Sequence, residues 1–412
     1  MFRDVKSMCD IGAVAMDERL VFLGFLGCSS FIALYNRETM AFIGLYNFMC
    51  GSPTRMLVLS DLEKLVCSTS AGYLYVWDTS DKTVERLTQI TNDPLTLDGF
   101  VHPSTRVVPV TEVTSTTLES CVDVDRVPGT SIVVMLAADG ELTFFDITGG
   151  AKLTSKKPIE TENYQALCLI INDISSTFRN RNGHWAAIGF TKGLIALIFI
   201  PLIDNGSGTK KVDIDNVFAV KQNTDDGCDV NCLAFRKKSS ASSSTTIIAG
   251  CSDGAVRCFV FKKSEDEIQL HKSASYVHCR AAKKGQVLKL ISGCHTNGTP
   301  YVVSLCRMQM PYDYHTQPLA DTKATPADSS TYCTEIIMQT LLQDQCEEYV
   351  VLAHIRDMVS DLTAGIDNSS YIYTTYDDPF VIRRLSETNE WQRAKRIEWN
   401  TPTNRKLLLK LL

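Results

Sequence analysis

The feature that most constrains this chain is a short pattern that recurs at four places, each built around a glycine. The four stretches read SAGYLYVWD, ADGELTFFD, TKGLIALIF and SDGAVRCFV, and their glycines are Gly72, Gly140, Gly193 and Gly254. A short apolar run ends just before each glycine, and an alternating apolar run follows it. This order predicts a β-hairpin, because glycine adopts the positive φ that a tight turn requires.

Further copies of the pattern extend it over most of the chain. Residues 19–36 repeat the two runs around Gly27, residues 369–385 repeat them around a Pro-containing turn, and residues 288–307 fill the space between. From Gly27 to Gly254 the mean spacing is roughly 57 residues, so seven units fill the 412 residues. A lean propeller blade needs only about 40–45 residues, so this spacing predicts loop insertions.

These hairpins resemble the WD40-repeat family of β-propellers. The resemblance implies an all-β fold, a single propeller of seven four-stranded blades over residues 1–400, followed by a Leu/Lys-rich tail at 401–412. The family places a Trp-Asp pair at the end of the third strand of a blade. Trp77 and Asp78 keep this pair in full, and Asp146 keeps the Asp.

The repeats depart from the family pattern, because no Gly-His pair stands near the start of a blade. We therefore expect packing to hold most blades, with Trp77 between two of them. We give the repeat glycines, Asp78 and Asp146 structural roles. Residues 390–400 are predicted to form the outer strand of the last blade and to close the ring.

Composition places the chain among intracellular proteins. The net charge is only -6, and the 15 cysteines are scattered, as is usual for reduced thiols that serve as small apolar residues. The N-terminal residues do not read as a signal peptide. We expect a cytoplasmic or nuclear location and no membrane insertion, since the longest apolar stretch, from Gly193, is too short to span a bilayer.

No catalytic residue, metal site or cofactor is predicted. The sequence contains no phosphate-binding loop, no nucleophile elbow and no His-Glu-x-x-His motif. Cys228 and Cys232, with Cys251 and Cys258 downstream, have a spacing compatible with zinc. Burial of small apolar residues in strands is the ordinary explanation for Cys232 and Cys258, and we prefer it.

Basic residues gather in three insertions that we assign to the bottom face, which carries the first-to-second and third-to-fourth strand connections of each blade. The insertions are residues 174–183 and 203–213 of the fourth blade and 236–245 of the fifth. Their cations are Arg179, Arg181, Lys210, Lys211, Arg236, Lys237 and Lys238. Asp225, Asp226, Asp229 and Asp253 sort to the opposite, top face, so we expect a dipolar charge distribution.

Two further segments have the composition of contact surfaces. Residues 308–330 form a Pro-, Thr- and Ser-rich loop of the sixth blade, with Met308, Met310, Tyr312 and Tyr314 as adaptable contact residues. The tail carries Leu408, Leu409 and Leu411 among basic residues, and we expect it to dock in an apolar groove of a partner or of the propeller.

These observations favour a non-catalytic scaffold that mediates protein–protein interactions as a subunit of an intracellular complex. The alternative is a recognition module that reads a short charged ligand, a modified peptide tail or an RNA backbone, on one face. An enzyme with a site in the central channel is a third class. Fold resemblance by itself does not separate these classes.

Overall fold

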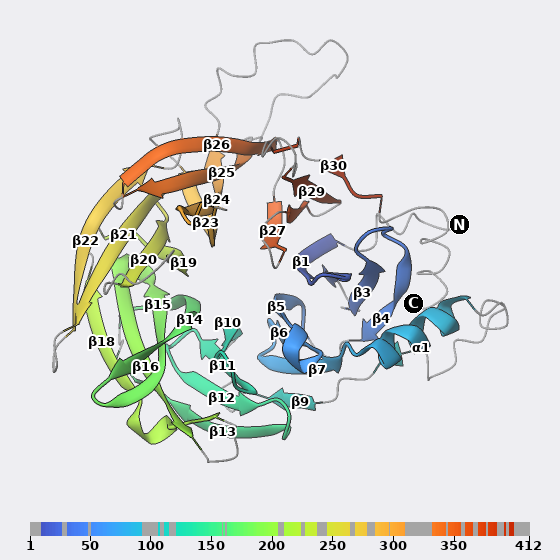
Figure 1. Cartoon of the computed structure of the whole chain (residues 1–412), viewed down its shortest axis with the longest axis horizontal. Coiled ribbons are helices and arrows are strands. Elements are labelled where there is room, and N and C mark those ends of the chain that lie inside the picture. The colour runs from blue at the N-terminus through green and yellow to red at the C-terminus, as the bar shows by residue number, and fades with distance from the viewer. Residues whose placement is uncertain are drawn as a thin grey trace, which may run out of the picture.

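The chain forms a closed ring of seven small antiparallel sheets around a central channel (Figure 1). The computed structural model describes residues 10–26, 31–47, 51–92, 106–107, 111–114, 121–158, 160, 163–204, 210–223, 227–236, 245–263, 268–277, 285–295, 297–309, 332–342, 345–355, 359–365, 370–375, 378–384, 391–392 and 395–398. The expected seven-bladed, all-β propeller is confirmed.

The first three blades lie within the first 156 residues of the chain. Blade one contains β1 (Asp10–Met16), β2 (Leu20–Leu26), β3 (Phe31–Asn36) and β4 (Phe42–Asn47). Blade two contains β5 (Pro53–Leu59), β6 (Lys64–Thr69), β7 (Tyr73–Asp78) and β9 (Thr111–Thr114). Blade three contains β10 (Cys121–Arg126), β11 (Ile132–Ala137), β12 (Leu142–Asp146) and β13 (Ala151–Lys156).

The next two blades have longer strands. Blade four contains β14 (Ala166–Phe178), β15 (Arg181–Phe190), β16 (Leu194–Asp204) and β18 (Phe218–Asn223), with a short β17 (Lys210–Val212) also paired to β16. Blade five contains β19 (Val230–Phe235), β20 (Thr245–Cys251), β21 (Ala255–Lys263) and β22 (Ile268–Val277).

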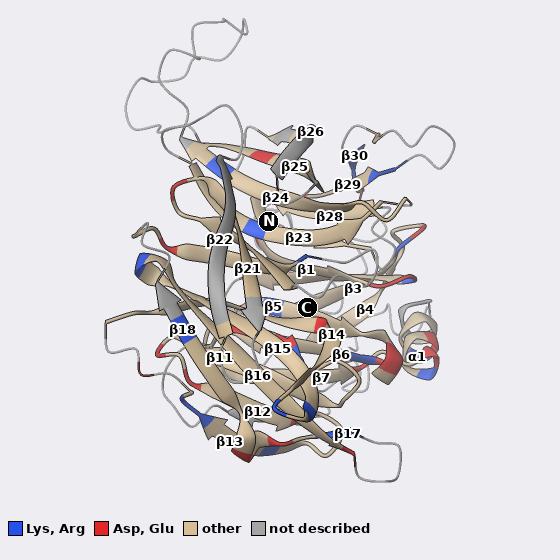
Figure 2. Ribbon diagram, turned by 60° about the vertical axis from the view of Figure 1, so that its left-hand side comes forward, with Lys and Arg blue, Asp and Glu red and all other residues tan. Residues whose placement is uncertain are grey.

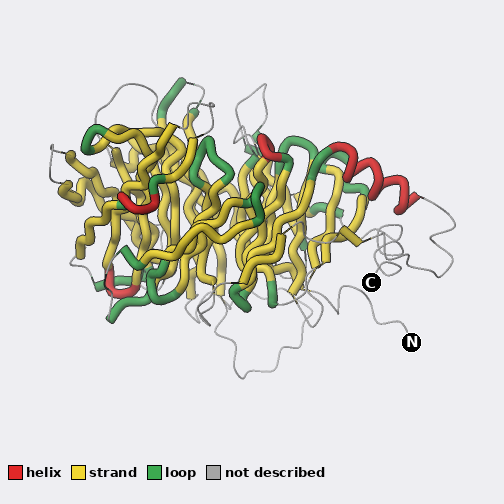
Figure 3. Tube along the Cα trace, turned by 90° about the horizontal axis from the view of Figure 1, so that it is seen from below, coloured by secondary structure: helices red, strands yellow, loops and turns green. Residues whose placement is uncertain are grey.

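The last two blades complete the ring. Blade six contains β23 (Gly285–Cys294), β24 (Pro300–Gln309), β25 (Tyr332–Leu342) and β26 (Gln345–Ile355). Blade seven contains β27 (Val359–Ala364), β28 (Ser370–Thr375), β29 (Pro379–Arg383) and β30 (Lys395–Arg396). Seen edge-on, the strands run from one face of the disc to the other, with the bottom face turned upward in Figure 3.

One long insertion ties the first two blades together. Between β7 and β9 the chain forms α1 (Asp81–Asn92) and β8 (Arg106–Val107), and β8 pairs in parallel with β4 of blade one. Leu87 of α1 is buried and lies where a side chain on Gly44 of β4 would be. The excursion therefore covers the outer edge of blade one before the chain returns to complete blade two, which blunts an exposed sheet edge.

Every inner strand carries a β-bulge at the same place. The first strand of each blade gains one residue against the second, at Gly12, Thr54, Val122, Leu167, Asn231, Leu288 and Ser360. A bulge increases local twist and redirects the side chains that follow it. The residue after each bulge therefore occupies an equivalent position around the channel.

The core consists of apolar layers between neighbouring blades. Trp77 is fully buried and stacks on Tyr46 of blade one, with ring centroids 5.6 Å apart and planes 6° from parallel. A second aromatic group fills the space between blades four and five, where Trp185 contacts Phe261 of blade five at 5.3 Å. Burying such large rings supplies much of the free energy that holds blades together.

The ring closes between blades one and seven. As expected, the C-terminal segment provides the outer strand of the last blade, although this strand, β30, is only two residues long. Ile397, just after it, is buried in the same cluster as Ile11 and Val14 of blade one. Arg37 of blade one donates to Ser370 Oγ of blade seven at 2.8 Å. The four strands of blade one, β1–β4, are consecutive in the sequence, so among the described residues no C-terminal strand pairs into that blade. Packing and hydrogen bonds between blades one and seven close the ring instead.

Among the helices of the described residues, none has the length and apolarity to cross a bilayer.

Candidate functional site

The four repeat glycines lie in the turns between second and third strands, as the pattern predicted for hairpins. Their φ angles are 80° at Gly72, 85° at Gly140, 75° at Gly193 and 79° at Gly254, all in the left-handed region. The turns place these four positions on the top face, because strands alternate in direction across each blade.

The Trp-Asp position ends the third strand with a network of hydrogen bonds. Asp78 accepts from Lys64 Nζ at 3.0 Å and from the hydroxyls of Ser80 and Thr83 at 2.6 and 2.5 Å. Burial opposes ionisation of Asp78, but these hydrogen bonds outweigh it and lower the pKa to about 2. Asp146 accepts from Ser131 Oγ at 2.8 Å in the equivalent place. Both carboxylates act within their own blades.

The central channel contains a hollow of about 580 Å³, with walls from all seven inner strands. The residues that follow the bulges occupy equivalent positions around it, and all of them except the one in blade one line it. They are Ala13, Arg55, Asp123, Cys168, Cys232, Lys289 and Asp361, and we call them the channel ring.

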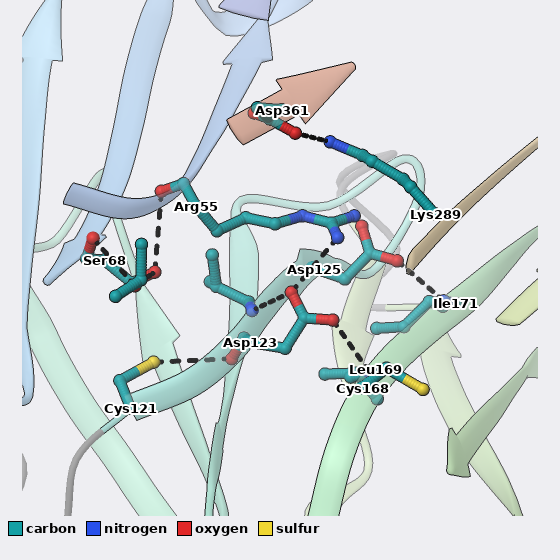
Figure 4. Close-up of polar contacts among 12 residues, drawn as sticks. Arg55, Ser68, Cys121, Asp123, Asp125, Cys168, Leu169, Ile171, Lys289 and Asp361 are labelled. Carbon is teal, nitrogen blue, oxygen red and sulfur yellow. Dashed lines mark hydrogen bonds and ion pairs between the residues drawn. The ribbon is translucent and has the colours of Figure 1, made fainter. Parts of the chain in front are cut away.

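The polar members of the channel ring reach across to the next blade (Figure 4). Arg55 of blade two pairs with Asp123 of blade three at 3.3 Å, and Lys289 of blade six pairs with Asp361 of blade seven. Asp123 also accepts the backbone N–H of Leu169 in blade four at 2.8 Å. The acceptor oxygens of these carboxylates are therefore engaged in joining blades.

Sulfur and amide groups continue these contacts. Cys168 Sγ lies 3.5 Å from the carbonyl oxygen of Val230 in blade five, and Asn231 Nδ2 donates to the carbonyl of Val287 in blade six at 3.2 Å. Asp361 closes the channel ring by accepting from the backbone N–H of Val14 at 2.9 Å. Ala13 takes the place in blade one, where the contact with blade two is apolar.

Asp125 forms a second link one step along the channel. Its Oδ2 accepts from the backbone N–H of Ile171 in blade four at 2.7 Å. Burial raises the pKa of Asp125 to about 6, against the opposing attraction of Arg55. Burial likewise raises the pKa of the Cys168 and Cys232 thiols, which makes them poor nucleophiles at neutral pH.

A second hollow lies on blade four. There the β14–β15 hairpin and the β16–β17 hairpin both extend beyond the last paired residues of β15 and β16. The β15–β16 pairing stops at Gly183 and Pro201. Beyond it β15 continues to Arg181, paired only with β14, and β16 continues to Asp204, paired with β17. We call the described residues of these two hairpins, 175–183, 202–204 and 210–213, the blade-four fork. They enclose a cleft of about 540 Å³.

Tight packing sets the base of the fork. A side chain at Gly183 would meet the carbonyl oxygen of Ile200 at 2.3 Å and the ring of Phe199 at 2.8 Å, so only glycine fits there. Pro201, the partner of Gly183 on β16, has no N–H with which to extend the ladder. The hairpins separate at these two residues.

Charged and apolar groups line the fork cleft. The ion pair between Arg181 and Asp213 spans it at 2.5 Å, with Arg181 45% exposed. Asp213 also accepts both contacts from the Asn216 amide, at 2.9 and 3.0 Å. Lys210 and Lys211 are exposed, and Ile203 exposes 48% of its surface.

The structure corrects the predicted loops of blade four. Residues 174–178 and 181–183 are strands, joined by a two-residue turn in which Arg179 and Asn180 have φ angles of 49° and 59°. Both central residues in the left-handed region define the turn type that matches strand twist. Residues 210–212 likewise form β17 where a loop was expected.

The predicted cations separate into different environments at the bottom face. Arg181 and Lys210 line the fork cleft, whereas Lys211 lies opposite Ile203 on the paired strand and Arg179 stacks over the ring of Phe218 at 4.2 Å. Arg236 is half-buried and donates to the carbonyl of Leu341 in blade six at 3.3 Å. Lys237, Lys238, Tyr312, Tyr314, Leu408, Leu409 and Leu411 lie outside the described residues, as do Asp225 and Asp226.

One expectation on the top face needs correction, whereas Asp229 and Asp253 lie at the top-face ends of β19 and β20 as expected. Met308, expected in a contact loop, is buried in β24 with 4% exposure. The described acidic residues of that face have local partners: Asp253 pairs with Arg257 at 2.6 Å, and Asp229 accepts from the backbone of Lys192 at 2.9 Å. Charged residues of both signs lie at strand ends around the ring (Figure 2).

The channel ring was missed from the sequence, although it leaves a signal. Each inner strand has an aliphatic residue or methionine directly after the channel-ring position, in frame with the bulge. These residues are Val14, Met56, Val124, Leu169, Leu233, Leu290 and Leu362. The repeats were aligned on the turn glycines. The channel-ring residue differs in type from blade to blade, so this alignment did not indicate that it makes contacts.

Within the described part of the chain, no group of three or more His, Cys, Asp or Glu side chains could hold a metal ion. Cys232, Cys251 and Cys258 are buried free thiols, and Cys228 is half-buried.

Comparisons with known proteins agree with this architecture. No protein-family model and no curated protein sequence matches the chain. Among solved structures, the WD40 repeats of RRP9 are 8% identical and align at a TM-score of 0.52 over 93% of this chain and 91% of that one. The computationally designed Ika8 protein is 13% identical, at 0.52, over 94% and 87%.

A third similar structure is the β-propeller domain of Cps50 (Swd1) from Myceliophteria thermophila. It is 10% identical and aligns at a TM-score of 0.53 over 89% of this chain and 94% of that one. Identities this low show the fold alone. The seven sheets in a ring and these structural neighbours show that the chain has the seven-bladed β-propeller fold, which is similar to that of WD40-repeat structures.

Proposed function

We propose that this chain is a non-catalytic scaffold subunit, which binds protein partners in an intracellular multi-subunit complex of the cytoplasm or nucleus. The observation that carries the proposal is the use of the channel ring. Arg55, Asp123, Lys289 and Asp361 are engaged in contacts between blades, so their charges serve to hold the ring. Propellers of this type generally act as interaction scaffolds.

The scaffold would present its faces and outer strands to partners. We retain residues 1–400 as one propeller unit and the tail, with Leu408, Leu409 and Leu411, as a docking element. Tyr312 and Tyr314 remain proposed contact residues. The alternative is a recognition module for an acidic peptide or RNA backbone, and the exposed Lys210 and Lys211 favour it.

Affinity purification of the tagged full chain from native cells, followed by mass spectrometry, tests the proposal. A scaffold retains a constant set of partner proteins in whole-number ratios after washes at 0.15 and 0.5 M salt. Contacts that depend mainly on exposed charges weaken at the higher salt, where screening is stronger. Recovery of only salt-sensitive, substoichiometric ligands would support the recognition module and contradict the scaffold.

A further inference from the structure

The blade-four fork has the construction of a peptide-binding cleft. Two strands, β15 and β16, run on past the end of their shared ladder and form the walls. An extended segment can lie along strand walls, where backbone groups supply affinity and alternate side chains supply specificity. The cleft of about 540 Å³ falls within the range of specific ligand pockets.

Charge selects the kind of segment. The described fork residues carry four cations, Arg179, Arg181, Lys210 and Lys211, against two carboxylates, Asp204 and Asp213. Asp215 follows just beyond the second hairpin. Asp213 is engaged with Arg181 and Asn216. Lys210, which lies opposite Asp204 on the paired strand, lines the cleft and is exposed to an incoming anionic group. This is a local excess of positive charge on a chain of net charge -6.

Apolar exposure separates a peptide from a nucleic acid. Ile203 exposes 48% of its surface at the cleft, which suits an aliphatic side chain of a bound segment. Single-stranded RNA is held largely by stacking on exposed aromatic rings. The aromatic residues at the base of the fork, Phe178 and Phe199, are 1% and 2% exposed.

From these features we infer that the blade-four fork binds an extended segment of a protein partner in which carboxylate and aliphatic side chains alternate. Lys210 contacts the carboxylates, Ile203 contacts an aliphatic side chain on the opposite face of the hairpin, and the Arg181–Asp213 pair keeps the hairpins in place. This inference rests on the proposed function, because it assigns one partner-binding surface of the scaffold.

The test is fluorescence anisotropy of the full chain with three labelled probes in 0.1 M salt. The probes are an end-blocked ten-residue peptide of alternating Glu and Val, the same peptide with Lys for Glu, and a twelve-nucleotide oligouridine. We expect saturable binding of the Glu–Val peptide only. Absence of its binding up to about 1 mM, the limit of weak recognition, would overturn the inference.

Variants locate the contact. Lys210→Glu with Lys211→Glu should weaken peptide binding at least tenfold, and Ile203→Ser should weaken it several-fold, since these exposed residues do not support the core. The matched control is Lys82→Glu with Arg86→Glu on exposed positions of α1, which makes the same charge change and should leave affinity unchanged. Thermal melting checks that all variants fold.

Other outcomes count against the inference. Oligouridine binding that is lost in the lysine variant and kept in Ile203→Ser would assign the fork to nucleic acid. An equal loss of peptide affinity in the α1 control would show that the lysine variant acts through the net charge of the protein and not through a contact at the fork. If native partners co-purify in constant ratios with every fork variant, the scaffold stands and the fork assignment fails. If the peptide binds at the fork but no partner co-purifies in a constant ratio, the fork assignment is supported and the scaffold proposal fails.

Discussion

The channel ring and the blade-four fork contain the same pair of residue types and use them differently. Arg55 and Asp123 are 30% and 6% exposed and join two blades across the channel. Arg181 and Asp213 are 45% and 14% exposed and join two hairpins of one blade beyond the ladder. A charged pair therefore holds the ring in one region, while in the other it shapes an exposed surface.

The difference follows from position along the blade. Inner strands are surrounded by their neighbours, so a side chain after a bulge finds backbone and charges of the next blade within reach. The fork extends away from those neighbours and faces solvent. Four predictions test this division, ordered by expected effect on stability.

The largest effect is expected from removing the closure of the ring. Truncation after Asn389 deletes Trp391, which lies 5.4 Å from the ring of Tyr371, and the buried Ile397. Loss of these contacts should destabilise the chain by about 4 kcal/mol or more and expose an unpaired sheet edge. Thermal melting and light scattering measure the outcome.

The point variant Ile397→Ala serves as the milder control, with an expected loss of about 2 kcal/mol. A truncated chain that melts at the same temperature as the full chain would show that closure does not depend on this segment.

The second effect concerns the channel ring. Asp123→Ala leaves the Arg55 guanidinium without its carboxylate and the N–H of Leu169 without its acceptor, which should destabilise the chain by about 3 kcal/mol. Denaturant unfolding measures the change.

Blades two and three provide a matched control at their rim. Asp61 pairs with Arg126 between the same two blades, but Asp61 is 60% exposed. Asp61→Ala should cost less than about 1 kcal/mol, because exposed ion pairs contribute little. Equal losses in the two variants would contradict the division between channel and surface.

The third effect is on the pH dependence of stability. The pKa of Asp125 in the folded chain is about 6, above that of an unfolded Asp, so the folded state holds an extra proton between about pH 4 and 6. Stability should fall as pH rises through this window, by at most about 1.4 kcal/mol per pH unit. Denaturant unfolding at a series of pH values measures the slope.

Asp125→Asn should remove this slope while keeping the shape of the side chain. Asp78 and Asp253 have the opposite sign, since hydrogen bonds hold their pKa values at about 2. Their contribution is present above about pH 4 and is lost as pH falls toward 2. An Asp125→Asn variant with the parental slope between pH 4 and 6 would refute the assignment.

The smallest effect is expected from the charges of the insertion in blade five that is predicted from the sequence to lie on the bottom face. Lys237→Glu with Lys238→Glu should change stability by less than about 0.5 kcal/mol and lower the affinity of any acidic partner at this face. Adding Arg236→Glu should cost about 1 kcal/mol more, because its guanidinium donates to Leu341. Denaturant unfolding measures the change in stability, and partner pull-down at physiological salt measures the change in affinity. If the variants retain every partner, these charges do not contribute to binding.

Several features were predictable from the sequence because their causes are local. Alternating apolar residues beside Gly72, Gly140, Gly193 and Gly254 specify hairpins, and seven such units specify a propeller. The location of the basic insertions at one end of blade four followed from counting strands. The length of the strands there did not, because a type of turn with Arg179 and Asn180 in left-handed geometry has no strong sequence mark.

Only the tertiary structure decided which polar residues join the blades and which face solvent. The hydrogen bond from Leu169 to Asp123 spans 46 residues of chain, and that from Val14 to Asp361 spans 347. Such contacts arise from ring closure, which brings distant inner strands side by side. The sequence periodicity of a strand indicates which of its faces is buried. Which residues of the neighbouring blade contact that face depends on how the whole ring is assembled.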